Sequence, residues 1–450
     1  MADVQPFRGL RYNPERIGDL SAVISPPYDV ISAEEQLLYH RKSPYNVIRL
    51  EFGEERAEDS GQNDKYTRAA LNLKNWLKDG ILIREGSPAF YLVEHRFRYQ
   101  GPAKSRFSLI ARVRLEDFSS GQIRPHEMTL RRPSADRIRL LQSCRANLSP
   151  IMGLYRHHGE GILSLLPDTI DKPALTAVDN HGITYSMWVI TDEEAIARVC
   201  RFFTEKVLYI ADGHNRYEAA LAYQQEQRSA RPSGKEAFNF VMMALTDSED
   251  PNLIMLPTHR LVRGLDAKTL EKLERESDLY FRKELLAPLA NKEETLRSWL
   301  DILKDRGQHQ KTLGLYGLDG RHLRLLRLRP EKLPADQPSA LRDSDVYILH
   351  QLILRQILGI DGPEMGETNL KYTRDESEAV NLVDSGEYQL AILLNPAPVS
   401  SVLAVADEGA RMPQKSTYFY PKTPAGLVIN PLWTKKLTSS RGRPPRAGSR

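Results

Sequence analysis

The sequence has few cysteines and no long apolar stretch. Only Cys144 and Cys200 occur among its 450 residues, and two isolated thiols support neither a disulfide framework nor a cysteine-based zinc site. No apolar run approaches the roughly 20 residues that a membrane-spanning helix needs, and the N-terminus lacks the charged-then-apolar layout of a signal peptide. We therefore expect a protein of the reducing cytoplasm with no membrane partner.

Several catalytic signatures are absent as well. The sequence holds no GxxxxGK[ST] loop, no glycine-rich dinucleotide fingerprint after a strand, no HExxH and no GxSxG. These absences argue against P-loop NTPases, Rossmann dehydrogenases, HExxH metalloproteases and serine hydrolases of the GxSxG type. With 41% hydrophobic and 27% charged residues, the chain has the composition of an ordinary globular protein, and its length predicts two or three domains.

The excess of positive charge is confined to the C-terminus. The formal net charge is +4, but the last 17 residues, from Thr434, contain six basic residues and no acidic one. Removing these six from the 63 basic residues leaves 57 against 59 acidic ones, a net charge of −2. A nearly neutral body argues against a broad nucleic-acid surface. We expect residues 434–450 to form a disordered basic tail whose RGRPPR segment either enters a minor groove or stays solvated.

The most informative stretch reads VLYIADGHNRYEAALAY. Its first five residues are β-branched, aromatic or otherwise apolar and predict a buried strand, and the alanine-rich part from Asn215 predicts a helix. Asp212 and Gly213 form a tight turn between the two. The free N–H groups of a helix N-terminus suit a phosphate; His214 and Arg216 add donors, and Asp212 can hold a metal ion. The alternative is a plain strand-to-helix turn capped by Asp212.

A second candidate is the pair His126 and Glu127, which follows the QIRP segment and precedes a helix expected from Ser134. Adjacent residues of an extended chain face opposite ways, so only one of the two can point into a pocket. The Glu127 carboxylate can accept a proton from a substrate hydroxyl or bind a metal ion together with Asp212. The alternative is a glutamate in a surface loop.

Other segments place polar residues beside apolar strands. In RANLSPIMGLY, Asn147 either lines the same site or is the stop of a helix, and we favour the helix stop. In MPQKSTYFYPK, Lys415, Ser416 and Thr417 offer an ammonium and two hydroxyls to a phosphate or carboxylate, or form a polar turn. SPPYDV is either a stiff pocket wall or a rigid surface loop. The apolar setting of His259 in LPTHRLV favours a structural role for this histidine.

Several of these stretches together resemble known families. The chain resembles the DUF1015 family of bacterial and archaeal proteins in PFRGLRY, SPPYDV, SPYNVIRLE, RPHEMTL, RANLSPIMGLY, IADGHNRYEAALAY, LPTHRLV and MPQKSTYFYPK. IADGHNR and the helix after it resemble the phosphate-binding motif of the ParB/sulfiredoxin-like fold, in the DGHHR form of free-serine kinases. A sulfiredoxin-like activity would need a cysteine in this motif, and the turn here contains none.

The resemblance implies roles for individual residues. In free-serine kinases a His-Glu pair precedes the DGHHR motif and its glutamate is the proposed base. This implies Glu127 as the base, Asp212 as the second catalytic residue, and both as ligands of Mg²⁺. ATP or ADP is the implied phosphate donor. Residues implied in phosphate or nucleotide binding are His126, Gly213, His214, Asn215 and Arg216, with Asn215 where the kinases have a second histidine.

The element pattern predicts an α/β (α+β) fold, and the resemblance gives it a ParB/sulfiredoxin-like core elaborated by large insertions and a further α+β subdomain. Residues 46–52 are predicted to form a strand, and 312–316 with 323–328 a hairpin. The expected regions are an N-terminal α+β region at 1–120, the core with both motifs and an insertion at 121–262, a C-terminal α+β region at 263–433, and the tail.

The leading functional interpretation is a nucleotide-dependent phosphotransferase acting on the alcohol group of a small metabolite, as a free-serine kinase does. Phosphoryl transfer needs positioning and charge neutralisation, which a helix N-terminus, a metal ion and one base supply. A ParB-like nucleotide-binding regulator or switch without turnover is the alternative, and a non-enzymatic scaffold is the third possibility. The sequence shows no helix-turn-helix pattern, which argues against DNA binding.

Overall fold

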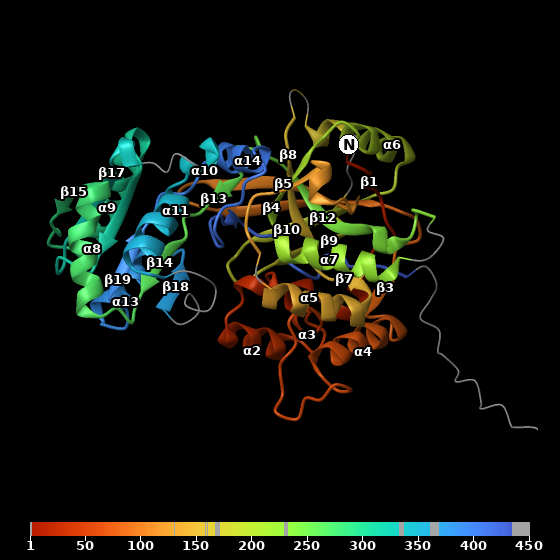
Figure 1. The fold of residues 1–450 in the computed structure, drawn as a ribbon. Helices are drawn as coiled ribbons and strands as arrows, with labels where there is room; N and C mark the ends of the chain where they lie inside the picture. Colours follow the sequence, from red (N-terminus) through yellow and green to blue (C-terminus); the bar gives the residue numbers. More distant parts are fainter. Residues whose placement is uncertain are drawn as a thin grey trace, which may run out of the picture.

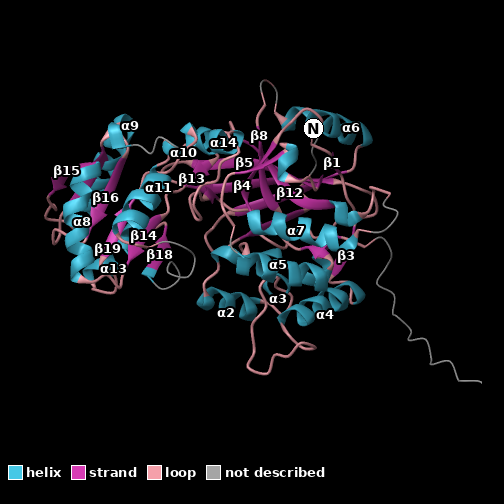
Figure 2. Ribbon diagram, in the orientation of Figure 1, coloured by secondary structure: helices cyan, strands magenta, loops and turns pink. Residues whose placement is uncertain are grey.

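The computed structural model describes residues 2–129, 131–157, 159, 161–166, 172–228, 233–332, 337–360 and 369–433. The expected basic tail at 434–450 lies outside the described residues. The described chain forms two lobes, one around a nine-stranded sheet and one around a six-stranded sheet (Figure 1). Each lobe combines helices with strands (Figure 2), so the predicted α/β class is confirmed.

The larger sheet has the strand order β6-β11-β8-β12-β5-β4-β10-β9, and β1 pairs with β5 beyond the end of β4. Its strands are β1 (Val4–Gln5), β4 (Phe90–Arg98), β5 (Ala103–Arg114), β6 (Ile123–Pro125), β8 (Ile151–Tyr155), β9 (Leu175–Val178), β10 (Thr184–Ile190), β11 (Leu208–Asp212) and β12 (Phe240–Asp247). Two neighbouring pairs are parallel, β11 with β6 and β12 with β8.

Helices cover this sheet on both faces. They are α1 (Pro14–Ile17), α2 (Ala33–Lys42), α3 (Ile48–Glu51), α4 (Lys65–Lys78), α5 (Arg131–Cys144), α6 (Glu193–Phe203) and α7 (His214–Gln227). Because side chains alternate along a strand, Val241 and Met243 of β12 pack in one apolar cluster with α6 and α7. Met242 and Ala244 pack in another with α4. Helix α5 lies between α7 and α4 (Figure 1).

The second sheet has the order β15-β17-β16-β19-β14-β18. Its strands are β14 (His259–Val262), β15 (Phe281–Leu286), β16 (Thr312–Tyr316), β17 (Leu323–Leu328), β18 (Leu370–Thr373) and β19 (Leu390–Leu393). Helices in this half of the chain are α8 (Ala267–Tyr280), α9 (Lys292–His309), α10 (Ser339–Arg342), α11 (Asp345–Ile348), a π-helical turn (Leu349–Ile357), α13 (Glu376–Asp384) and α14 (Val399–Asp407). The β16–β17 hairpin has the predicted bounds.

After α14 the chain returns to the first lobe. Three short strand pairs fasten distant segments, and two of them use this returning part of the chain. The pairs are β2 (Leu10–Tyr12) with β3 (Leu82–Arg84), β13 (Ile254–Met255) with β20 (Phe419–Tyr420), and β7 (Ala146–Asn147) with β21 (Asn430–Pro431). The returning segment therefore lies against strands that precede it by more than 150 residues.

Two sequence predictions differ from the structure. Residues 46–52 contain helix α3 rather than a strand, because the buried Asn46 amide accepts a hydrogen bond from the Ile48 N–H (2.9 Å) and donates to the Ala22 and Ile24 carbonyls. These bonds override the preference of β-branched residues for a strand in this segment.

The second difference concerns the expected insertion, because its strands β9 and β10 extend the main sheet. The boundary expected at 120/121 therefore runs through one sheet.

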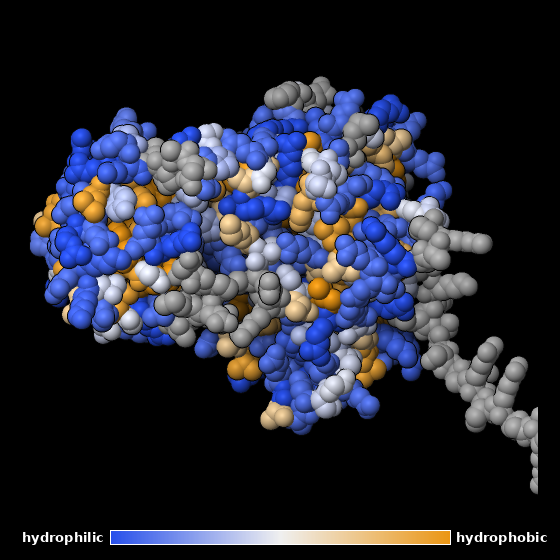
Figure 3. Space-filling model, in the orientation of Figure 1, coloured by the Kyte–Doolittle hydropathy of each residue, from blue (hydrophilic) through white to orange (hydrophobic). Residues whose placement is uncertain are grey.

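Neither the described helices nor the visible surface points to a membrane-spanning segment. None of the described helices combines the length and apolar composition needed to cross a membrane. The face shown in Figure 3 is mostly hydrophilic, with apolar residues in scattered groups. Both cysteines have free thiols, Cys144 buried and Cys200 partly exposed.

Candidate functional site

The strand-turn-helix expected around Asp212 is present. Strand β11 ends at Asp212, Gly213 adopts a left-handed conformation (φ 91°, ψ 28°), and α7 begins at His214. No side chain caps this helix, so Asp212 does not serve as its N-cap. The first-turn N–H groups of α7 therefore have no side-chain acceptor among the described residues, which leaves them available to an anion.

Gly213 is required here for two separate reasons. Its φ is unfavourable for other residues, and a Cβ at this position would lie 2.8 Å from Arg216 Nε. We expect Gly213→Ala to destabilise the fold by more than the roughly 1 kcal/mol of a left-handed alanine alone. Gly80→Ala is the matched control, because Gly80 has φ 71° with nothing within 4 Å of an added Cβ. Equal unfolding free energies for the two variants would show that the contact with Arg216 is unimportant.

Parallel pairing brings Glu127 to the same place. Strand β6 pairs with β11 in the register Pro125↔Ile210, so the residues after Pro125 and after Ile210 leave the sheet at one edge. Glu127 and Asp212 are 85 positions apart in the sequence, yet both line one cavity of about 440 Å³.

This cavity lies where the two lobes meet. Its walls come from the loop at residues 28–32, the ends of β6 and β11, the α7 N-terminus, and residues 414–422 of the returning segment. The second lobe contributes Tyr372 and Arg374, which lie at and just after the end of β18. Of the two interpretations of SPPYDV, the structure supports the pocket wall.

A buried lysine occupies the centre of the charged part. Lys422 Nζ contacts Asp29 Oδ2 at 3.1 Å and also Asp212 Oδ1, and its side chain is 9% exposed. Arg216 contacts the other oxygen of Asp212 at 2.7 Å. Burial raises the pKa of Asp29, but the charges of Lys422, Lys415 and Arg216 outweigh it and hold this pKa well below its ordinary value. The Asp29 carboxylate is therefore ionised, and these cations compensate its charge.

Glu127 has a different environment. Its Oε1 accepts a hydrogen bond from the Lys415 N–H at 3.0 Å. Burial raises the pKa of Glu127, and the charge of Asp212 raises it further, while Lys415 and Lys422 oppose the shift. A carboxylate with a raised pKa binds a proton more readily than an ordinary glutamate, which suits a general base.

His126 lies behind the cavity wall. Its side chain is 1% exposed, with Nδ1 2.8 Å from the Ile210 carbonyl oxygen and Nε2 2.9 Å from Thr417 Oγ1. Burial lowers the pKa of His126 to about 4, so the ring is neutral near pH 7. The ring packs edge-on against His214, 4.7 Å between centroids. Of the adjacent pair, Glu127 lines the cavity and His126 supports the wall.

The remaining predicted residues divide into two groups. Asn215 and Thr417 line the cavity together with Lys415, Gly213, His214 and Arg216. Ser416 does not: it is 4% exposed and donates to the Pro413 carbonyl. Asn147 also lies elsewhere, because its side-chain oxygen accepts from the Met242 N–H and from Asn430. The helix before Asn147 ends at Cys144, where Arg145 takes a positive φ of 49°.

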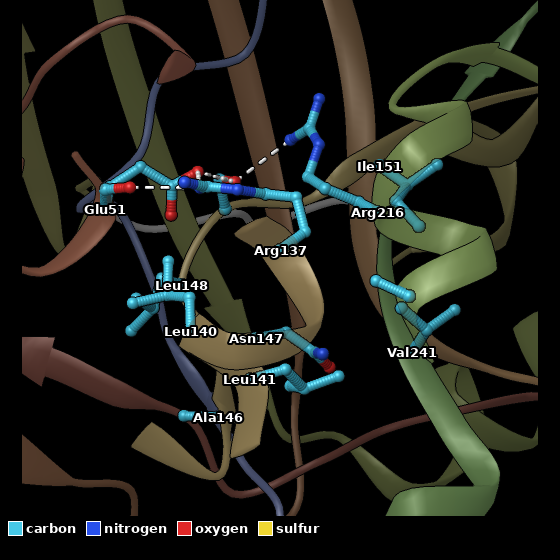
Figure 4. Close-up of a pocket in the computed structure, with 12 residues that line it drawn as sticks. Glu51, Arg137, Leu140, Leu141, Ala146, Asn147, Leu148, Ile151, Arg216 and Val241 are labelled. Carbon is cyan, nitrogen blue, oxygen red and sulfur yellow. Dashed lines mark hydrogen bonds and ion pairs between the residues drawn. The ribbon is translucent and has the colours of Figure 1, made fainter. Parts of the chain in front are cut away.

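A second, smaller cavity of about 40 Å³ adjoins the site behind Arg216 (Figure 4). Arg216 donates to Ser149 Oγ at 3.0 Å, and Ser149 donates to Glu51 at 2.7 Å. Arg137 points toward Glu51 in Figure 4, and its guanidinium lies 3.8 Å from the centre of the Tyr28 ring in the main cavity. This buried network holds Arg216 and Tyr28 in place from behind.

Sequence reasoning missed several lining residues. Lys422 and Asp29 stand in MPQKSTYFYPK and SPPYDV, but no periodicity or spacing marks either as a site residue. Tyr372 and Arg374 lie in the second lobe outside its LPTHRLV segment, in a stretch with no recognised motif. The one available signal was that Lys422 directly follows an aromatic-proline run. Such a run predicts burial, and a buried lysine needs carboxylates nearby.

The fold and cavity define an α/β protein with a charged cavity at the junction of two lobes. Comparison with family models places residues 4–347 in a family described as protein of unknown function, DUF1015. The chain belongs to the DUF1015 family, as the sequence motifs predicted. A comparison with curated proteins finds no match.

Solved structures give distant matches. A conserved hypothetical protein from Pyrococcus furiosus is 12% identical, covering 71% of this chain and 93% of that chain, with a TM-score of 0.34. A free serine kinase in complex with AMP is 11% identical, covering 72% and 91%, with a TM-score of 0.34. SbnI from Staphylococcus aureus with a C-terminal truncation is 10% identical, covering 72% and 87%, with a TM-score of 0.34. Similarity at this level carries no functional argument.

Proposed function

We propose that this protein is a nucleotide-dependent phosphotransferase that acts on the hydroxyl group of a small metabolite, with free serine as the first acceptor to test. One observation supports the proposal most. Glu127, whose pKa is raised, and the uncapped N-terminus of α7 line a single cavity beside Lys422. A base and a phosphate-binding terminus in one cavity are the parts that phosphoryl transfer requires.

In the proposed reaction each group has one role. The N–H groups at the start of α7 and the Lys422 ammonium bind and neutralise the transferring phosphate. Glu127 accepts the proton of the acceptor hydroxyl as the oxygen–phosphorus bond forms and the bond to the leaving phosphate breaks. Tyr372 and Arg374 close the cavity from the second lobe and limit the access of water.

The carboxylates of the cavity fit a magnesium ion that arrives with the nucleotide. Asp29 Oδ1 is buried without a hydrogen-bond partner among the described residues, and Asp212 and Glu127 line the same cavity. The described residues form no group of three or more metal-ligating side chains. Mg²⁺ is commonly held by one or two carboxylates, water and phosphate oxygens, so Asp212 and Glu127 suffice. When bound, the ion neutralises charge on the phosphates.

A thermal-shift screen with ATP, ADP, CTP and pyrophosphate, each with and without Mg²⁺, tests the binding part. We expect the melting temperature to rise with at least one adenine nucleotide, and to rise further with Mg²⁺, because a ligand that binds only the folded state stabilises it. EDTA is expected to remove the magnesium-dependent part. The absence of a shift with all four ligands would contradict the proposal and favour a scaffold.

Asn215 provides a specific test of phosphate contact. Its side-chain oxygen accepts a hydrogen bond from Ser134 Oγ at 3.0 Å, which turns the amide NH₂ toward the remaining contacts in the cavity. We expect Asn215→Leu to weaken nucleotide binding about tenfold, the effect of one lost hydrogen bond to a charged group. Ser134→Ala serves as the control, because it removes the partner and keeps the amide. Unchanged affinity in Asn215→Leu would exclude a phosphate contact.

A nucleotide-binding switch without turnover is the second candidate, and one observation favours it. Both oxygens of Asp212 are paired with buried cations, Lys422 and Arg216. Pairing with two cations of the chain leaves Asp212 less free to take part in catalysis, which favours binding without turnover. Nucleotide-dependent stabilisation without phosphate transfer to serine or other hydroxylated metabolites would support the switch.

A further inference from the structure

Arg260, in the second lobe, is buried without a matching anion among the described residues. It lies in β14, is 2% exposed, and forms no ion pair with a carboxylate among the described residues. Its guanidinium donates to the Lys415 carbonyl at 3.0 Å and to the Thr258 carbonyl, and packs 5.2 Å from the centre of the Tyr372 ring. Burying a charge in this way is unfavourable unless something else in the fold benefits from it.

The Lys415 residue links Arg260 to Glu127. Its carbonyl accepts from Arg260, and its N–H donates to the Glu127 carboxylate at 3.0 Å. Lys415 is one of few described non-glycine residues with positive φ, at 55°. Such a conformation is unfavourable for lysine and persists only where surrounding contacts impose it. Arg260 supplies one of these contacts, from behind the cavity.

We propose that Arg260 is a positioning residue for Glu127: its guanidinium fixes the Lys415 backbone, whose N–H holds the Glu127 carboxylate. The proposal rests on the phosphotransferase function for its catalytic consequence, but not for the contacts themselves. It also gives the second lobe a role, since β14 then carries part of the support for a base that belongs to the first lobe.

Other groups act on Glu127 as well, and the test has to leave them unchanged. Burial is the largest influence on the pKa of Glu127 and raises it. The Lys415 N–H and the charges of Lys415 and Lys422 lower this pKa, and the charge of Asp212 raises it. The remaining neighbours are the Thr417 hydroxyl at 3.5 Å, the Arg411 guanidinium on the Glu127 carbonyl at 3.4 Å, and Tyr372. Arg260, like Arg411, is not among the residues that line the cavity.

The first measurement needs no turnover. Amide hydrogen exchange of the segment around Lys415 is compared in the full-length wild-type protein, Arg260→Met and Arg260→Lys. Arg263→Met is the control, because the Arg263 guanidinium packs on a different ring, 5.2 Å from the centre of Tyr388. We expect exchange of the Lys415 amide to rise about tenfold or more in Arg260→Met, because the backbone that presents this N–H to Glu127 is released. It rises less in Arg260→Lys and stays at the wild-type rate in Arg263→Met. Wild-type exchange in Arg260→Met would overturn the proposal.

The second measurement is phosphate transfer by the same variants. Arg260→Met is expected to lower kcat and to leave nucleotide affinity near the wild-type value, because a misplaced base affects the chemical step more than binding. Arg260→Lys can still donate to the Lys415 carbonyl and is expected to recover part of the lost kcat. A wild-type kcat in Arg260→Met would overturn the positioning role. If Arg260→Met does not fold, Arg260→Lys decides alone, with faster Lys415 exchange and a lower kcat expected. Failure of all variants and the wild type to transfer phosphate would contradict the proposed function, while the exchange result would still test the contacts.

Discussion

Glu127→Gln is expected to bind nucleotide like the wild-type protein and to transfer phosphate about 10²–10⁴-fold more slowly. The substitution keeps the size of the side chain and removes its ability to accept a proton. Loss of the proton acceptor affects the chemical step, so it changes kcat more than it changes the affinity for nucleotide titrated without Mg²⁺. The measurement is a turnover assay with ATP or ADP and serine, paired with calorimetric titration of the same nucleotide.

Stability provides a readout of Glu127 that does not depend on activity. Because the pKa of Glu127 is raised in the folded state, this residue favours folding below its ordinary pKa of 4.5 and loses that contribution as the pH rises. Glu127→Gln is therefore expected to melt at a higher temperature than the wild type near neutral pH, with a smaller gain at acidic pH. A lower melting temperature at neutral pH, together with weaker nucleotide binding, would indicate a structural role instead.

Lys422→Met is expected to have the largest effect on stability. It leaves Asp29 and Asp212, which are 23% and 18% exposed, without their shared cation. Breaking a fully buried pair costs about 3–5 kcal/mol of unfolding free energy, and we expect a loss toward the lower end of that range. Nucleotide binding is also lost, since Lys422 is proposed to contact the phosphate. Chemical denaturation and a thermal shift with ADP and Mg²⁺ measure the two effects.

Two controls separate the buried site from lysine loss in general. Lys283 also joins two carboxylates, Glu274 and Asp278, but both are more than half exposed; Lys283→Met is expected to cost about 1 kcal/mol or less. The second control adds Asp29→Asn to Lys422→Met, which removes the carboxylate that has lost its contacting cation and is expected to recover part of the stability. An equal loss in Lys422→Met and Lys283→Met would contradict the account.

The same variant predicts a pH dependence. Lys422 helps to hold the pKa of Asp29 below its ordinary value of 3.8, so this carboxylate stabilises the fold above that pH and the contribution disappears as the pH falls. The difference in melting temperature between the wild type and Lys422→Met is therefore expected to be large near neutral pH and to shrink below about pH 4. A difference independent of pH would show that Asp29 is not the partner that matters.

Local sequence pattern was sufficient where neighbouring residues determine structure. The strand, Gly213 turn and helix around Asp212 follow from apolar runs and one glycine, and the β16–β17 hairpin from two such runs around a turn. The pattern failed at residues 46–52, where the buried Asn46 amide bonds to backbone more than 20 residues away. Such bonds have no signature in a local window.

The candidate site was predictable in part for the same reason. Motif resemblance and residue chemistry led to Glu127 and Asp212, which parallel pairing of β6 and β11 brings to one cavity. Lys422 was not predicted, because it reaches Asp212 only after the chain has built the second lobe and returned. Arg260 was missed likewise, since its role depends on the carbonyl of a residue 155 positions later.

The central claim is that the cavity between Glu127, the α7 N-terminus and Lys422 binds the phosphates of a nucleotide. The most direct test is a crystal structure of the full-length protein with ADP and Mg²⁺. The account predicts a phosphate within hydrogen-bond distance of the His214 or Asn215 N–H and of Lys422 Nζ, and the Glu127 carboxylate facing the terminal phosphate. A nucleotide bound elsewhere on the protein, with this cavity unchanged, would contradict it.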